Sequence, residues 1–106
     1  MSSNRTLMVL PGDGVGPEVV NETLRVVEWL AKNKSITFNV KEGLVGGASY
    51  DKYGTPLTDE ILADTIEADA VLFGAVGGPK YDGVDFDKRP ENGLLRLRKE
   101  MDLFAN

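Results

Sequence analysis

Two short apolar runs, each stopped by glycine or proline, place the strongest constraint on how this chain can fold. Residues 7–10 are followed by Pro11 and Gly12, and residues 70–73 are followed by Gly74. A continuous apolar run bounded in this way is typical of a strand covered on both faces, as in a parallel sheet. Between the runs, apolar residues recur at three- and four-residue steps. They predict a helix over 18–33 with an inner face of Val20, Leu24, Val27, Leu30 and Ala31.

The other elements continue this alternation. Apolar and polar residues alternate over 36–41 and predict a half-exposed strand. Loop-forming residues flank a short segment at 48–51, and Thr58 is the expected N-cap of a second helix. Residues 80–89 lack periodicity and predict a long loop, after which Pro90 opens a third helix.

This order of elements predicts an α/β fold, with part of an open, mostly parallel sheet flanked by helices. The last helix runs nearly to the end of the sequence, and no further strand follows that could cover the other edge of the sheet. We therefore expect residues 1–106 to be the N-terminal part of the first α/β domain of a longer protein, with no second domain present.

Composition narrows the possible partners and compartments. The net charge is −5, from 17 acidic and 12 basic residues, which argues against nucleic acid as a partner. No window approaches the roughly 18 apolar residues of a membrane span, and the first apolar run is too short for a signal peptide. The chain has no cysteine and no histidine, so thiolate chemistry is excluded and acid–base chemistry needs other groups. These features favour a cytoplasmic protein that does not bind membranes.

The glycine-spaced turn at 12–16 resembles a dinucleotide-binding fingerprint but departs from it. That fingerprint needs a third glycine where Pro17 stands, and proline removes an N–H from the site that would hold the phosphates. Glu42 is only a loose match to the acidic residue that should end the next strand. A tight turn from strand to helix, which uses the backbone freedom of glycine, is the better interpretation. We therefore do not expect an ordinary Rossmann fold.

The segment 74–80 has the length of a P-loop, but Pro79 and Tyr81 replace the glycine and the Ser or Thr of that motif. The segment nevertheless leaves the carboxyl end of a strand, where open α/β sheets bind ligands. On spacing alone, a structural loop and a binding loop both remain open.

The third predicted helix carries the most specific chemistry. Leu94, Leu95 and Arg98 are three or four residues apart, so one ligand could meet all three. A guanidinium beside two leucines suits a molecule with a carboxylate and a branched apolar group. The alternative is that the leucines pack in the core while Arg98 points to solvent.

Three sequence blocks resemble the β-decarboxylating dehydrogenases, which act on isopropylmalate, isocitrate, homoisocitrate and tartrate. The block LPGDGVGPE at 10–18 resembles the N-terminal signature of the family. The blocks GAVGGPK at 74–80 and RPENGLLRLRK at 89–99 resemble the isopropylmalate branch, and DLFAN at 102–106 continues that pattern. The resemblance extends from Leu7 to Asn106. It implies the fold of that branch.

The resemblance implies NAD-dependent oxidation of a malate derivative followed by loss of carbon dioxide. Isocitrate enzymes of the family place a serine and an asparagine on the equivalent helix to hold a third carboxylate, and Leu94 and Leu95 cannot make those hydrogen bonds. The leucines therefore imply 3-isopropylmalate as the substrate, 4-methyl-2-oxopentanoate as the product, and a role in leucine biosynthesis. Arg98 would clamp a substrate carboxylate, and the leucines would line the alkyl pocket.

Glu91 would lie near the nicotinamide ribose. The implied NAD-binding residues are Val15, Gly78, Pro79, Lys80, Tyr81, Asp82, Gly83, Val84, Asp85, Phe86, Asp87, Lys88, Arg89, Pro90 and Glu91.

The same resemblance implies that most of the chemistry lies outside these 106 residues. The catalytic tyrosine and lysine, and the aspartates that bind Mg or Mn, would follow Asn106, and the enzyme would be a homodimer. No catalytic or metal-binding residue is expected on this chain. Two alternatives stay open: a related dehydrogenase of homoisocitrate, tartrate or isocitrate, and a non-enzymatic fragment. We expect the isolated chain to be inactive and poorly folded or aggregating, because its sheet edge and helix faces lack partners.

Overall fold

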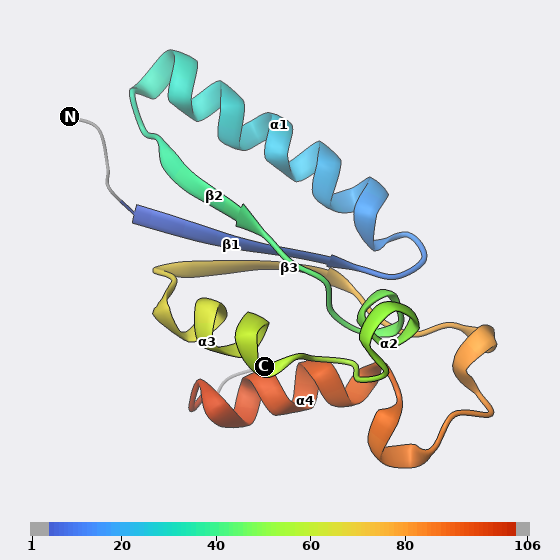
Figure 1. The fold of residues 1–106 in the computed structure, drawn as a ribbon. Coiled ribbons are helices and arrows are strands. Elements are labelled where there is room, and N and C mark those ends of the chain that lie inside the picture. The colour runs from blue at the N-terminus through green and yellow to red at the C-terminus, as the bar shows by residue number, and fades with distance from the viewer. Residues whose placement is uncertain (1–4, 104–106) are drawn as a thin grey trace.

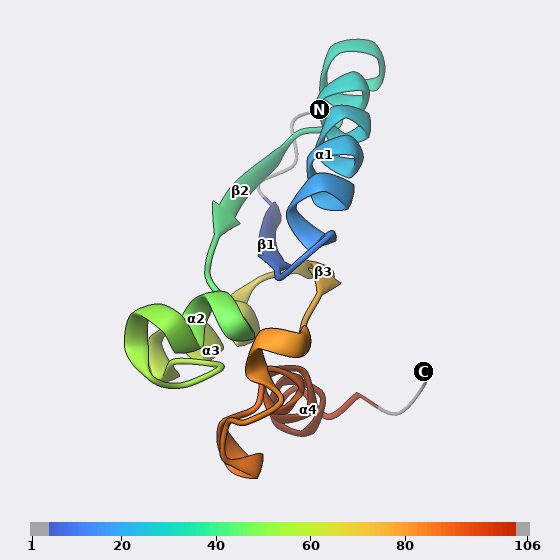
Figure 2. The same ribbon diagram turned by 90° about the vertical axis from the view of Figure 1, so that its right-hand side faces the viewer.

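A computed structural model describes residues 5–103 and shows a three-stranded parallel sheet with helices on both faces (Figures 1 and 2). The strands are β1 (Arg5–Gly12), β2 (Phe38–Glu42) and β3 (Ala70–Ala75), in the spatial order β2-β1-β3. The helices are α1 (Gly16–Lys34), α2 (Gly47–Tyr53), α3 (Asp59–Glu67) and α4 (Glu91–Glu100). Two short 3-10 helices, η1 (Pro79–Tyr81) and η2 (Phe86–Lys88), lie between β3 and α4.

The central strand β1 contributes to two separate cores, one on each face of the sheet. Because side chains alternate along a strand, Leu7 and Val9 pack on one face with Val20 of α1. On the other face, Met8 and Leu10 pack with buried residues of α3, α4 and the loops beside them, namely Val45, Leu57, Leu62 and Leu97. Covering on both faces explains why this strand is a continuous apolar run.

Several predicted elements are confirmed. The parallel α/β order is as expected, and Val20 is the most buried of the predicted inner-face residues of α1. The Thr58 hydroxyl accepts a hydrogen bond from the Ile61 backbone N–H at 3.2 Å, so it caps α3 as predicted. Pro90 is the residue before α4.

The two outer strands differ from the predictions. Strand β2 runs from Phe38 to Glu42 rather than starting at Ile36, and only Phe38 is even partly buried. Glu42 therefore does end the strand, contrary to the loose match expected. Strand β3 is partly exposed rather than fully buried. The exposure of both strands has the same physical reason: within residues 5–103, each of them has only β1 as a neighbour.

The short segment at 48–51 forms most of α2, a helix that local sequence did not indicate. Its N-cap, Gly46, has a positive φ of 75°, which glycine adopts without strain. The first free backbone N–H groups of α2, those of Gly47 and Ala48, donate to the carboxylate of Asp13. A distant carboxylate thus supplies the cap that the residues next to the helix lack.

Candidate functional site

The carboxyl ends of β1 and β3 meet at one edge of the sheet, and glycines make this meeting possible. Gly12 lies opposite Ala75, and a side chain on Gly12 would overlap the Ala75 carbonyl oxygen. Side chains on Gly16 or Gly74 would both overlap the Pro11 carbonyl oxygen. Gly12 also has a positive φ of 80°. These contacts confirm the tight strand-to-helix turn predicted for 12–16.

A buried carboxylate, that of Asp13, joins three segments at this edge. It accepts hydrogen bonds from the backbone N–H groups of Gly47 at 2.6 Å, Ala48 at 2.7 Å and Gly77 at 2.9 Å. The Asp13 backbone N–H donates to the Ala75 carbonyl oxygen at 2.6 Å. Hydrogen bonds from N–H groups to a carboxylate are stronger than those between neutral groups. Asp13 therefore fixes the start of α2 and the loop after β3 against the end of β1.

The loop after β3 touches the start of α4 at Gly77. This glycine has a φ of +104°, and a side chain on it would overlap the carboxylate of Glu91. Glu91 is the first residue of α4, and the preceding Pro90 is buried. The two ends of the long segment from Gly77 to Glu91 are therefore in contact, and the intervening residues form a closed loop.

The beginning of that loop is anchored on α2. Lys80 Nζ and the Tyr81 hydroxyl each lie 2.9 Å from Asp51 Oδ2, to which both donate. The ring of Tyr81 lies where a side chain of Gly47 would be, and it meets the Tyr50 ring edge-on with centroids 6.3 Å apart. Residues 80–81 are thus held by α2.

We call the contacts of Asp51 with Lys80 and Tyr81 the anchor. These contacts change the pKa of all three side chains. The hydrogen bond from Lys80, and then that from Tyr81, lower the pKa of the Asp51 carboxyl. The bond to Asp51 raises the pKa of the Lys80 ammonium. Burial, followed by the bond to Asp51, raises the pKa of the Tyr81 hydroxyl. All three shifts favour the ionisation states that form the anchor at neutral pH.

The rest of the loop is held by Arg89 and Asn92. The Arg89 guanidinium donates to the carbonyl oxygens of Val84 and Asp82, both at 3.3 Å, and lies 5.9 Å from the centre of the Phe86 ring. Asn92 donates to the Phe86 carbonyl oxygen. Arg89 therefore shapes the loop from within. Other loop residues predicted to bind NAD are exposed, namely Pro79, Gly83, Asp85, Asp87 and Lys88.

A groove of about 360 Å³ lies between this loop and α4. Leu95 lines it and is 52% exposed. The other lining residues are Gly78, Tyr81, Asp82, Phe86, Arg89, Glu91 and Asn92. Six lining residues belong to the segment 78–91 that is predicted to bind NAD, which we call the cofactor loop. They share the groove with Leu95, one of the two leucines predicted to contact the substrate. Leu94 and Arg98 are partly buried and lie outside its lining, and Val15 is exposed just before α1.

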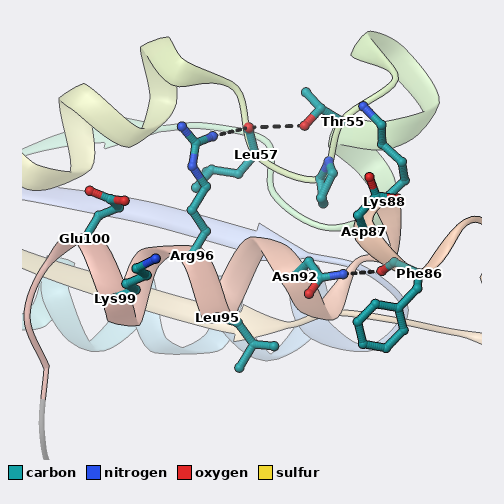
Figure 3. A pocket seen from close by; sticks show the side chains of 11 residues that line it. Thr55, Leu57, Phe86, Asp87, Lys88, Asn92, Leu95, Arg96, Lys99 and Glu100 are labelled. Carbon is teal, nitrogen blue, oxygen red and sulfur yellow. Dashed lines mark hydrogen bonds between the residues drawn. The ribbon is translucent and has the colours of Figure 1, made fainter.

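A larger, open groove of about 570 Å³ adjoins the first along α4 and shares Phe86, Asn92 and Leu95 with it (Figure 3). Arg96 points toward the start of α3, where it donates to the Leu57 carbonyl oxygen at 3.0 Å and to Asp59 Oδ1 at 2.6 Å. Leu95 points away from Arg96 and lines both grooves. Arg96 and the buried Leu97 thus set the rotation of α4 and leave Leu95 on an open face.

Comparison with known proteins decides the family. The model of the isocitrate/isopropylmalate dehydrogenase family matches residues 6–106. The chain belongs to this family. The resemblance found in the sequence is thereby confirmed, although its last three residues, 104–106, lie outside the described structure.

Its relatives in the family include 3-isopropylmalate dehydrogenases. The protein of that name from Ruegeria pomeroyi is 60% identical over 104 residues, and the one from Cereibacter sphaeroides is 59% identical over 104 residues. Each match covers 98% of this chain but 28% of the relative, so the chain spans little more than a quarter of their length.

Two solved structures share the fold. A β-decarboxylating dehydrogenase from Thermococcus kodakarensis matches with a TM-score of 0.65 and 35% identity, over 94% of this chain and 27% of that one. An isocitrate dehydrogenase from Methylococcus capsulatus matches with a TM-score of 0.71 and 26% identity, over 95% and 27% respectively. The family fold, an open parallel sheet with flanking helices, is therefore the fold of this chain.

Sequence reasoning missed two carboxylates that organise this part of the family fold. Asp13 carried a usable signal, because aspartate in a glycine-rich turn commonly accepts backbone N–H groups. Asp51 carried no such signal in the sequence, because its partner Lys80 is 29 residues away.

Within residues 5–103, no helix combines the length and apolar content needed to cross a bilayer. The same residues bring together no group of three His, Cys, Asp or Glu side chains suited to a metal ion.

Proposed function

We propose that this chain is the N-terminal part of an NAD-dependent 3-isopropylmalate dehydrogenase. The reaction is the oxidative decarboxylation of 3-isopropylmalate to 4-methyl-2-oxopentanoate, a step of leucine biosynthesis in the cytoplasm. The observation that carries the proposal is the half-exposed Leu95 in one groove with Gly78 and Glu91. An apolar side chain beside a polar loop offers a site for an alkyl group next to a cofactor. The names of the relatives at 59–60% identity support the same activity.

Substrate choice follows from the chemistry of α4. Leu95 and its neighbour Leu94 have no polar side-chain atoms, so they favour an isopropyl group over a third carboxylate. A carboxylate left without a hydrogen-bond partner against leucines costs several kcal/mol, at least about 2. Arg98, one turn further along α4, supplies a cation for a substrate carboxylate. The described residues thus select among malates by their third substituent.

The loop fits part of a dinucleotide. Gly78 and Gly83 have open space where side chains would project, so a ligand can approach their backbone closely. Glu91 lies against Gly77, and its carboxylate is the proposed acceptor for a ribose hydroxyl. These residues would hold part of NAD, which would supply the hydride acceptor for oxidation of the substrate's secondary alcohol. The chain's own part in the reaction is to bind and orient, and proton transfer is assigned to groups outside it.

The proposal includes Mg or Mn and a homodimer. By the resemblance to the family, the metal ligands are assigned to residues that follow Asn106. Partners are limited to the small-molecule substrate, the cofactor and a second subunit.

A chimera tests this function. Residues 1–106 replace the matching N-terminal segment of the Ruegeria pomeroyi relative, to which they are 60% identical. We expect turnover of 3-isopropylmalate with NAD within about tenfold of the parent enzyme. The control is the same chimera with Arg98→Ala, which should lose most activity while remaining folded. A folded chimera that turns over homoisocitrate, tartrate or isocitrate but not 3-isopropylmalate would favour the alternative dehydrogenases.

A further inference from the structure

We propose that α2 is a positioning clamp for the start of the cofactor loop, acting through Asp13 and Asp51. These carboxylates hold Gly77 and residues 80–81, respectively, against the same short helix. The assignment of this segment to cofactor binding rests on the proposed function. That α2 fixes the geometry of the segment follows from the contacts alone.

The first half of the clamp is the carboxylate of Asp13. Its Oδ2 accepts from the N–H of Gly47, at the start of α2, and from the N–H of Gly77, 64 residues from Asp13 along the chain. Oδ1 accepts from Ala48. One buried side chain therefore sets the distance between α2 and the beginning of the loop. The loop cannot move away from the sheet edge without breaking a bond to a carboxylate.

The second half is Asp51 in the last turn of α2. It accepts hydrogen bonds from both Lys80 and Tyr81 of η1. Asp51 and Lys80 are exposed, so solvent screens their attraction, and the geometry rests on two donors converging on one oxygen. Lys80 therefore helps to fix the start of the loop to α2.

Gly47 joins the two halves. Its backbone N–H donates to Asp13, and the space beside its Cα is filled by the ring of Tyr81. A methyl group there would collide with the Tyr81 ring atoms. A side chain at position 47 would therefore displace the Tyr81 ring from its place against α2.

This geometry makes Asp13, Gly47 and Asp51 positioning residues, none of which lines the groove beside Leu95. Loosening the clamp should affect cofactor binding more than substrate binding, because the substrate leucines and Arg98 lie on α4. That helix is held separately, by Arg96 and by the core.

The test uses the chimeric enzyme with Asp51→Asn, Gly47→Ala and Asp13→Asn. The matched control is Asp64→Asn on α3, because the Asp64 side chain makes no hydrogen bond or ion pair with any of residues 5–103. For Asp51→Asn and Gly47→Ala we expect KM for NAD to rise about three- to tenfold, the change produced by losing an ordinary hydrogen bond. The KM for 3-isopropylmalate should stay close to the control in both variants. If Asp13→Asn fails to fold, the other two variants still decide.

Amide hydrogen exchange on the same proteins separates the clamp from the proposed function. We expect faster exchange at residues 77–84 in both Asp51→Asn and Gly47→Ala, with α1 and α4 unchanged. Unaltered exchange across 77–84 would overturn the clamp, whatever the enzyme does. Faster exchange in a chimera that does not use NAD would uphold the clamp and count against the proposed function. Equal rises in the KM values for NAD and for substrate would overturn the separate roles of α2 and α4.

Discussion

At the scale of single residues, the site depends on glycines in close contacts. Gly77 combines a φ of +104° with a position against the Glu91 carboxylate. A residue with a side chain pays a conformational cost at such a φ and also displaces Glu91. Backbone and side-chain constraints coincide here, at the point where the loop meets α4.

The first prediction concerns Gly77→Ala in the chimeric enzyme. We expect the free energy of unfolding to fall by about 1–3 kcal/mol, from strain at positive φ and from the displaced carboxylate. Urea denaturation measures the change. Gly83→Ala is the control for stability, because Gly83 has open space around it and no positive φ, so alanine there should be neutral or slightly stabilising. Equal destabilisation by both changes would contradict the assigned contact.

The second prediction is the pH range of the anchor between Asp51 and η1. The lowered pKa of Asp51 means that its contribution is present above the ordinary value of about 4 and is lost as pH falls through the lowered pKa. The raised pKa values of Lys80 and Tyr81 mean that their contributions are present below about 10 and are lost as pH rises through the raised values. Amide protection at residues 78–84, corrected for intrinsic exchange, should therefore be constant between about pH 5 and pH 9. A loss of protection near pH 7 would contradict the assignment.

At the scale of elements, α4 divides its leucines between core and site. Leu97 is buried, at 3% exposure, whereas Leu95 in the same helix is 52% exposed. Sequence spacing grouped Leu94, Leu95 and Arg98 but could not say which leucine faces open space. The structure distinguishes them, because Arg96 and Leu97 fix the rotation of the helix.

The third prediction separates these leucines by substitution. Leu95→Ala should lower kcat/KM for 3-isopropylmalate about tenfold or more while changing that for malate little, because malate has no alkyl group to bind. Leu94→Ala should act in the same direction but less strongly, since Leu94 is partly buried and lies outside the groove. Leu97→Ala should instead lower the free energy of unfolding by about 2–5 kcal/mol. Equal losses with malate and with 3-isopropylmalate in Leu95→Ala would contradict the pocket.

The elements also show what local sequence can and cannot predict. The run 7–10 and the cap at Thr58 are local signals, and both were predicted. The helix α2 was not, because its cap comes from Asp13, 34 residues from the first amide that it caps. The anchor between Asp51 and Lys80 was not predicted either, because its two residues are also far apart in the sequence. Contacts that only the folded chain brings together leave no periodic pattern in either segment.

At the scale of the whole molecule, α1 has apolar residues on two faces. Its inner face packs on the sheet through Val20, but Val19, Val26 and Trp29 on the outer side are each more than half exposed. Within residues 5–103, both β2 and β3 pair only with β1. Exposed apolar side chains and unpaired strand edges favour association.

The fourth prediction is that the isolated 106-residue chain self-associates and turns over no 3-isopropylmalate. Sedimentation velocity should show species larger than a monomer, and the fraction of monomer should rise in Val26→Lys/Trp29→Lys. Conversely, a monodisperse monomer with cooperative unfolding would contradict the expected instability. Measurable turnover by the chain alone would contradict its assignment as only part of an active site.

Under the proposed function, the leucines of α4 favour 3-isopropylmalate over isocitrate. The most direct measurement is the ratio of kcat/KM for 3-isopropylmalate to that for isocitrate in the chimeric enzyme, with NAD. We expect a ratio of about 100 or more, because isocitrate would place an unpaired carboxylate against Leu94 and Leu95. A ratio near one, or a preference for isocitrate, would contradict the account.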